Sequence, residues 1–165
     1  NQQIQINILM RAEELKPDPL IHAIEAWLEM EHDEDDVETI LRDPRSRPFR
    51  RPPGGIQYLY RCLVTDGALD SEPAYEKYVT YSISVDGAIA FYDSLKTDED
   101  FVIVRKQFRP ADFVLDFTAL RNHVMPTDPD NPRISISERE IWMRNNAYYG
   151  RYAQSEVVYT SEDGP

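Results

Sequence analysis

The sequence predicts a single α+β domain, in which a mainly antiparallel sheet carries helices near residues 18–31 and 137–149. Three observations lead to this prediction. The length of 165 residues suits one domain. Two segments combine a helix-capping signal with an apolar or aromatic face. Four segments have the alternating or mostly apolar pattern of strands, namely residues 56–64, 77–85, 101–108 and 112–118.

Residues 77–85 have the clearest strand pattern in the chain. Val79, Tyr81, Ile83 and Val85 fall on one face of an extended segment, and mostly hydroxyl-bearing residues fall on the other. Alternation with a period of two is typical of a strand that has one buried face and one solvated face. The segment therefore predicts a strand at the centre of the fold.

Four further segments of the sequence predict strands. Residues 56–64 are mostly apolar, which favours a central strand. Only residues 109–111 separate the segments 101–108 and 112–118, so these two predict a hairpin. Residues 156–160 predict a last strand near the end of the chain.

Capping signals locate the two main helices. Asp18 is a favourable N-cap residue, and Pro19 suits the first helical position. Ser137 and Glu140 have the spacing of a capping box, and Gly150 suits the position just after a helix. These signals predict helices that begin near residues 18 and 137.

Residues 86–96 allow two interpretations. Asp86 and Gly87 between apolar segments favour a hairpin turn, which is our preferred interpretation. The alternative is a helix with Asp86 as its N-cap, because four apolar residues have helical spacing: Ala88, Phe91, Tyr92 and Leu95. Further along, three prolines predict that residues 121–133 form a loop.

The charge of the chain limits its partners. The formal net charge is −12, which opposes broad binding to nucleic-acid phosphates and to anionic membranes. No apolar run approaches the roughly 18 residues that a membrane span needs. We therefore expect a soluble protein, cytoplasmic or part of a large assembly such as a virion. Since the chain begins at Asn1, processing of its start stays open.

Cys62 is the single cysteine, so the chain can form no internal disulfide and no multi-cysteine metal site. Its position inside an apolar segment predicts a buried, unreactive thiol.

The first ten residues form a candidate N-terminal arm. Ile4, Ile6 and Ile8 alternate with polar side chains, as in a strand. Two interpretations stay open: an edge strand of the protein's own sheet, or an arm that adds to the sheet of a neighbouring subunit. Both interpretations use the same pairing chemistry.

The charge changes sign between two neighbouring segments. Residues 29–38 are mostly acidic and precede a short helix predicted over residues 36–41, whose dipole favours negative charge at its start. Residues 42–55 then hold five arginines and four prolines, which predict an extended loop. The loop either neutralises the preceding acids, contacts an acidic surface of another subunit, or contacts a phosphate or nucleic acid. Its candidate contact residues are Arg45, Arg47, Phe49, Arg50 and Arg51.

Ten tyrosines are a further indication of protein contacts, because tyrosine covers a large area and keeps a polar tip. On the helix predicted near 137–149, and just after it, the candidate contact residues are Tyr148, Tyr149 and Tyr152.

We find no motif that carries a known chemistry. The sequence has no glycine-rich phosphate loop and no nucleophile elbow, and its three histidines are far apart. We therefore assign no catalytic, cofactor-binding or metal-binding residue. An enzyme that uses carboxylates or a divalent cation is the alternative. Its candidate residues are four aspartates and one histidine, which we call the acidic pool: Asp66, Asp70, Asp98, Asp100 and His123.

These features together favour a non-enzymatic structural or assembly subunit. It would make protein–protein contacts, as a homo- or hetero-oligomer, in a larger complex such as a virus or phage particle. A second alternative to this function is an acidic inhibitor that mimics the charge of a nucleic acid.

Overall fold

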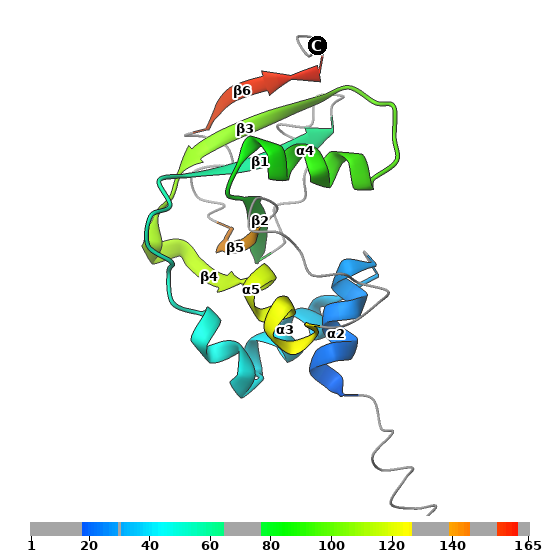
Figure 1. Cartoon of the computed structure of the whole chain (residues 1–165), viewed down its shortest axis with the longest axis vertical. Coiled ribbons are helices and arrows are strands. Elements are labelled where there is room, and N and C mark those ends of the chain that lie inside the picture. Colours follow the sequence, from blue (N-terminus) through cyan, green and yellow to red (C-terminus); the bar gives the residue numbers. More distant parts are fainter. Residues whose placement is uncertain (1–17, 30, 65–76, 127–138, 146–154, 162–165) are drawn as a thin grey trace, which may run out of the picture. The chain divides into compact units, whose positions relative to one another are not determined.

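The computed structural model describes residues 18–29, 31–64, 77–126, 139–145 and 155–161 (Figure 1). The chain divides into two compact units, Asn1–Pro44 and Arg45–Pro165, which are described separately. The predicted α+β class with an antiparallel sheet is confirmed.

The first unit contains two packed helices, α2 (Pro19–Leu28) and α3 (Glu34–Arg42). Helix α2 begins as predicted, because the Asp18 side chain accepts a hydrogen bond from the backbone N–H of Leu20 at 3.0 Å. Helix α3 is longer than the predicted 36–41, and Asp33 and Asp36 close a reciprocal capping box at its start. Both helices bury apolar residues, which are Leu20, Ala23, Ile24, Val37 and Ile40.

The second unit contains a six-stranded sheet in which every pairing is antiparallel. The strand order is β4-β5-β2-β1-β3-β6. The strands are β1 (Tyr58–Val64), β2 (Tyr78–Ser82), β3 (Phe101–Gln107), β4 (Phe113–Asp116), β5 (Glu140–Arg144) and β6 (Glu156–Thr160).

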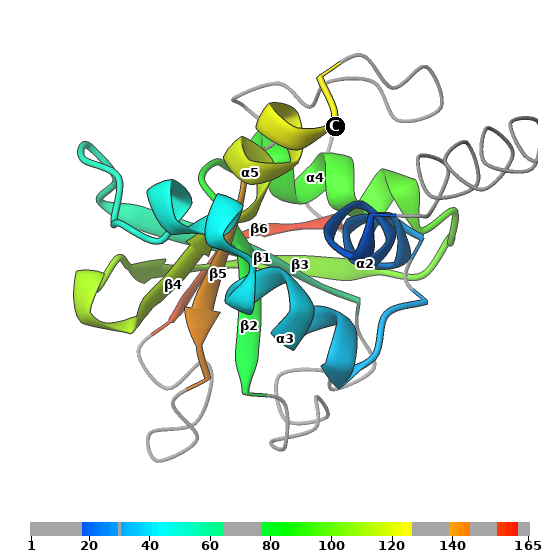
Figure 2. The same cartoon turned by 90° about the horizontal axis from the view of Figure 1, so that it is seen from below.

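This sheet consists of two three-stranded halves joined at its centre. Strand β1 pairs with β3 along its whole length, and β2 pairs with β5 along its whole length. Between β1 and β2, the described pairing is the single pair Tyr60 and Ser82. Figure 2 shows the consequence, because β2 and β5 run across the direction of β1 and β3. The two halves therefore present separate surfaces, and the half that ends at β6 is the more exposed.

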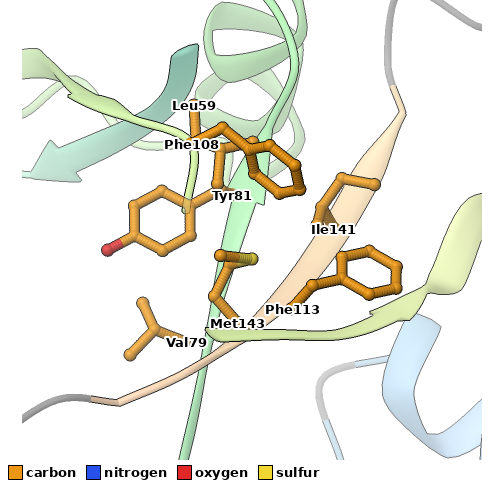
Figure 3. Close-up of a cluster of buried hydrophobic side chains, with 7 residues drawn as sticks. All are labelled: Leu59, Val79, Tyr81, Phe108, Phe113, Ile141 and Met143. Atoms are coloured by element: carbon orange, nitrogen blue, oxygen red, sulfur yellow. The ribbon is translucent and has the colours of Figure 1, made fainter. Parts of the chain in front are cut away.

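Two apolar clusters stabilise the halves. The first gathers side chains from β1, β2, β4 and β5 and from the end of β3 (Figure 3): Leu59, Val79, Tyr81, Phe108, Phe113, Ile141 and Met143. The second lies between the β1–β3 half and helix α4 (Val85–Ser94), and its buried members are Cys62, Ala88, Phe101 and Ile103. Each fully buried apolar side chain in such a cluster contributes about 1.5–3 kcal/mol relative to leaving it exposed.

Helix α4 corrects our preference for a hairpin at residues 86–96. The helical spacing was the right signal, since Ala88, Ile89 and Tyr92 pack together against the β1–β3 half. The N-cap is Ser84 rather than Asp86, and its hydroxyl accepts a hydrogen bond from the N–H of Gly87 at 3.0 Å. A hairpin would have placed part of this apolar face in water.

The predicted hairpin between residues 101–108 and 112–118 is also wrong. Strand β3 pairs with β1 and β6, whereas β4 pairs with β5. The short 3₁₀ turn η2 (Pro110–Asp112) separates them, and β4 ends at Asp116. Asp116 caps the next helix, α5 (Phe117–Val124), so the predicted loop at 121–133 is wrong for residues 121–124.

The helix predicted near 137–149 is wrong in its described part, which is strand β5. Ile141, Trp142 and Met143 are all buried, because β5 pairs with a strand on each side and both faces are covered. Trp142 stacks on Phe117 of α5, with ring centroids 5.3 Å apart and planes 8° apart. A doubly covered strand has a continuous apolar run, and the capping-box pattern does not exclude one.

The Arg/Pro-rich segment 42–55 differs from the extended loop that its prolines predicted. It contains the end of α3 and a 3₁₀ helix, η1 (Pro44–Phe49), with Pro48 inside it. Proline fits a 3₁₀ turn because its fixed φ lies within the helical range.

Candidate functional site

Part of the predicted contact set lies outside the described residues. This applies to Ile4, Ile6 and Ile8 of the arm and to Tyr148, Tyr149 and Tyr152, so their roles stay predictions. Two members of the acidic pool, Asp66 and Asp70, also lie outside the described residues.

The arginines of the predicted contact loop are brought together on η1 and the residues just after it. Arg45, Arg47, Arg50 and Arg51 are all exposed. Phe49 is half-buried against the ring of His123 on α5, with ring centroids 5.5 Å apart. The contact of Phe49 with α5 holds η1 against the second unit, and we call the four exposed arginines on and just after η1 the cationic cluster.

The structure does not assemble the described part of the acidic pool into a metal site. Asp98 and Asp100 are exposed in the turn between α4 and β3, and His123 is exposed on α5. The hydroxyl of Ser161 lies 3.4 Å from the carboxylate of Asp100 and accepts a hydrogen bond from the N–H of Phe101 at 3.0 Å. Asp100 thus lies where β3 begins and β6 ends. Among the residues that the structure describes, no group of three or more His, Cys, Asp or Glu side chains could hold a metal ion.

Cys62 is buried on β1, as predicted. Burial raises the pKa of its thiol to about 11, although the neighbouring Arg61 lowers it. The thiol is therefore protonated at neutral pH, and a protonated thiol is a poor nucleophile.

A row of polar side chains that the sequence did not predict crosses the exposed half of the sheet. Tyr60 on β1 lies opposite Arg105 on β3, and Arg105 lies opposite Glu156 on β6. The Nε of Arg105 donates a hydrogen bond to Glu156 at 2.7 Å, and its Nη2 forms an ion pair with the same carboxylate. The hydrogen bond to Glu156 is the main reason that the pKa of Arg105 is raised.

Arg105 also contacts an exposed tyrosine. Its guanidinium carbon lies 4.3 Å from the centroid of the Tyr58 ring. This geometry is a cation–π contact, in which the positive group is attracted to the negative face of the ring. The ion pair with Glu156 and the contact with the Tyr58 ring hold the Arg105 side chain in one orientation. The guanidinium N–H groups and the Tyr58 ring therefore lie next to each other.

Exposed apolar side chains occur on the same strands, and Val157, which lies opposite Val104, faces the other side of the sheet from Arg105 and Glu156. Among the described residues, the exposed large hydrophobic side chains are Tyr58 (40%), Phe91 (43%), Val157 (50%) and Val158 (37%). Phe91 is on α4, and the other three are on β1 and β6. Val158 is the extra residue of a β-bulge, since the register shifts between Ile103 and Val104. We call Tyr58, Arg105, Glu156, Val157 and Val158 the β6 surface.

The two ends of the sheet differ in how they are covered. All four residues of β4 are buried, whereas Glu156, Val157 and Val158 of β6 are exposed. Within the described part of the chain, β3 is the only strand neighbour of β6 (Figure 1). Exposed edge strands commonly carry lysine or proline, which prevents pairing with another chain. Strand β6 has neither of them, and its protective features are the bulge and the charged Glu156.

The β6 surface is electrically balanced within an acidic protein. Arg105 and Glu156 neutralise each other, and its remaining members are uncharged. The chain as a whole carries a formal charge of −12. The β6 surface therefore combines exposed valine side chains with a paired charge, which suits protein contacts, and the exposed Asp100 lies at the end of the strand.

No protein-family model, curated protein or solved structure gives a significant match to the chain. The described helices are all too short or too polar to cross a bilayer.

Proposed function

We propose that the protein is a non-enzymatic assembly subunit, which contacts other protein subunits through the β6 surface. This proposal rests mainly on the exposure of Val157 and Val158 on β6, the last strand of the sheet. The same strand carries Glu156, which forms an ion pair with Arg105. The larger complex would be a stable assembly of many subunits, of which a virus particle is one example.

The composition of the β6 surface supports protein contact. Tyrosine and arginine are enriched at interfaces, and they often provide the largest share of the binding free energy. In the β6 surface, the orientation of Arg105 is already fixed by Glu156 and Tyr58. A partner would therefore lose little side-chain entropy when it binds there. A terminal strand can also extend its sheet with a strand from a partner.

The cationic cluster on η1 supports a second contact in the same assembly. Arg45, Arg47, Arg50 and Arg51 are exposed in a chain whose formal net charge is −12. Charge complementarity steers such a cluster towards an acidic surface of a neighbouring subunit. Contacts of this kind weaken as salt rises, because surface charges are screened.

Size analysis of the native complex tests the proposal. Extracts of the source cells or particles are fractionated by size, and an antibody locates this chain. We expect the chain in fractions far larger than its 19.2 kDa monomer. If the chain is found only in monomer fractions, and the purified chain is monomeric at every concentration, the proposal is wrong.

A titration with Mg²⁺, Ca²⁺ and Mn²⁺ tests the enzymatic alternative. We expect no heat of binding and no change in the melting temperature at millimolar cation. A saturable heat that disappears when Asp98 and Asp100 are changed to asparagine would support a cation-dependent enzyme instead.

A further inference from the structure

We propose that the centre of the sheet is a hinge, and that the Arg61 side chain is the latch that sets the angle between the two halves. The halves are β1–β3–β6 and β2–β5–β4, and they are joined by the pair of Tyr60 and Ser82. The strands of one half run across those of the other (Figure 2). The hinge concerns the shape of the chain itself, so it holds whether or not the β6 surface binds a partner.

The direction of the backbone groups shows which residues of β1 and β2 could pair. The N–H of Phe108 donates to the carbonyl of Gln57, so the odd-numbered residues of β1 direct their backbone groups to β3. The N–H of Asn145 donates to the carbonyl of Lys77, so the odd-numbered residues of β2 direct theirs to β5. The even-numbered residues of β1 and β2 therefore direct their backbone groups towards each other.

Strands β1 and β2 diverge directly after the hinge. Continued from the pair of Tyr60 and Ser82, the antiparallel register would place Cys62 opposite Thr80. Both strands lie within the described residues, and this second pair is not formed. The two halves thus meet at one end of the β1–β2 boundary and separate towards the other.

The guanidinium of Arg61 bridges the diverging strands. Its Nη1 donates hydrogen bonds to the backbone carbonyl of Thr80 at 2.8 Å and to the Thr80 hydroxyl at 2.9 Å. Because side chains alternate along a strand, those of Arg61 and Thr80 leave the sheet on opposite faces. Both bonds therefore require the guanidinium to lie between the strands. It takes the carbonyl that the N–H of Cys62 would use in a continued ladder.

Apolar packing holds the hinge end and leaves the other end to Arg61. Beside the hinge, the cluster of Figure 3 joins Leu59 and Phe108 of the β1–β3–β6 half to side chains of the β2–β5–β4 half. The described clusters around Cys62 and Leu63, further along β1, contain no side chain from β2, β4 or β5. Rotation about the hinge end therefore disturbs few buried contacts, and the bonds from Arg61 to Thr80 oppose it. Hydrogen bonds from a charged donor are stronger than those between neutral groups, which suits a latch.

Distances between spin labels, measured by pulsed dipolar spectroscopy, test the hinge. Labels on Val157→Cys of β6 and Arg144→Cys of β5 are at exposed positions in different halves. Labels on Val157→Cys and Phe91→Cys are the matched control, because α4 packs on the β1–β3–β6 half. Cys62 stays unlabelled, since its thiol is buried and protonated.

We expect one narrow distance distribution for each label pair while Arg61 is present. Arg61→Met removes the donors and keeps much of the side-chain volume. It should add a second distance, shifted by several ångströms, to the Val157–Arg144 pair alone. Arg61→Lys keeps a charged donor and should stay close to the unchanged chain. Thr80→Val removes only the hydroxyl acceptor, and it should broaden the same distribution less, which tests the latch even if Arg61→Met does not fold.

Three results would overturn the proposal. A Val157–Arg144 distribution that stays single and narrow in Arg61→Met and Thr80→Val would show that Arg61 holds no hinge. Equal broadening of the control pair would indicate loosening of the whole unit instead of rotation of two halves. A broad Val157–Arg144 distribution in the presence of Arg61 would show that the latch does not fix the angle. The proposed function is tested separately, by the size of the native complex.

Discussion

Arg105 on β3 and Glu156 on β6 are joined by an ion pair directly across the two strands. They are 51 residues apart in the chain, and β6 has no other strand neighbour within the described residues. This pair therefore helps to hold the terminal strand against the sheet, in a place where both side chains are open to solvent.

Reversing the charge of Glu156 should loosen β6 without unfolding the protein. Glu156→Lys places two positive side chains opposite each other, which disfavours the strand pair. Amide hydrogen exchange at Val157 and Tyr159 should accelerate, while exchange in β2 and β5 should be unchanged. Glu156→Gln is the control, because it removes the ion pair without repulsion and should have a smaller effect. Equal acceleration across the whole sheet would contradict this account.

Truncating Met143 should destabilise the protein strongly, because its side chain is fully buried in the cluster of Figure 3. Met143→Ala should lower the free energy of unfolding by about 2–5 kcal/mol in urea denaturation. The neighbouring Arg144→Ala, at an exposed position, should change it by less than about 0.5 kcal/mol. A small effect of Met143→Ala would indicate that β5 is not a covered, central strand.

Removing the N-cap of α4 should reduce stability moderately. Ser84→Ala loses the hydrogen bond from the N–H of Gly87 and should cost about 1 kcal/mol in thermal or chemical unfolding. Ser84→Asp preserves an N-cap acceptor and should retain most of that stability. If the two variants are equally stable, residues 85–94 do not depend on this cap.

Cys62 should be unreactive until the pH is high. Burial raises the pKa of the thiol from 9.0 to about 11, so the folded state favours the protonated form. This contribution to stability is complete below about pH 9, and it decreases as the pH rises from 9 to 11, because the unfolded chain loses its proton first. Alkylation by iodoacetamide should be slow at pH 8 and should accelerate on unfolding. Cys62→Ser should flatten the decline in stability above pH 9.

The parts of the fold that local signals determine could be predicted from the sequence. Asp18 and Pro19 locate the start of α2, and the alternation around Val79 and Tyr81 locates β2. In both cases the residues that decide the structure are within a few positions of each other. The α+β class follows from these elements.

The wrong predictions concern elements that distant partners determine. Ile141, Trp142 and Met143 form a strand because β2 and β4 flank them, and the local capping-box pattern carries no information about those neighbours. The expected hairpin failed for the same reason, since the partners of β3 residues lie 37 to 49 positions earlier in β1 and 51 to 58 positions later in β6. Sequence spacing alone does not contain this pairing.

The β6 surface could not be predicted from the sequence, again because distant strands form it. Tyr58, Arg105 and Glu156 come from three strands, and only the register of the sheet brings them together. One local feature of the sequence could have predicted exposed apolar side chains on β6. Val157 and Val158 are adjacent in a predicted strand, so their side chains point to opposite faces, and a terminal strand rarely buries both. The predicted arm and the predicted tyrosine contacts lie outside the described residues and stay predictions.

Size fractionation of the native complex, with and without Val158→Lys, tests the central claim most directly. The account predicts that the unchanged chain is found in fractions far larger than its 19.2 kDa monomer. It predicts that Val158→Lys is found as a monomer, because lysine on an edge strand opposes pairing with another chain. Phe91→Lys, the same kind of change at an exposed position of α4, should stay in the complex. A complex that retains Val158→Lys and dissociates as salt rises would contradict the account, and it would point to the arginines of η1 instead.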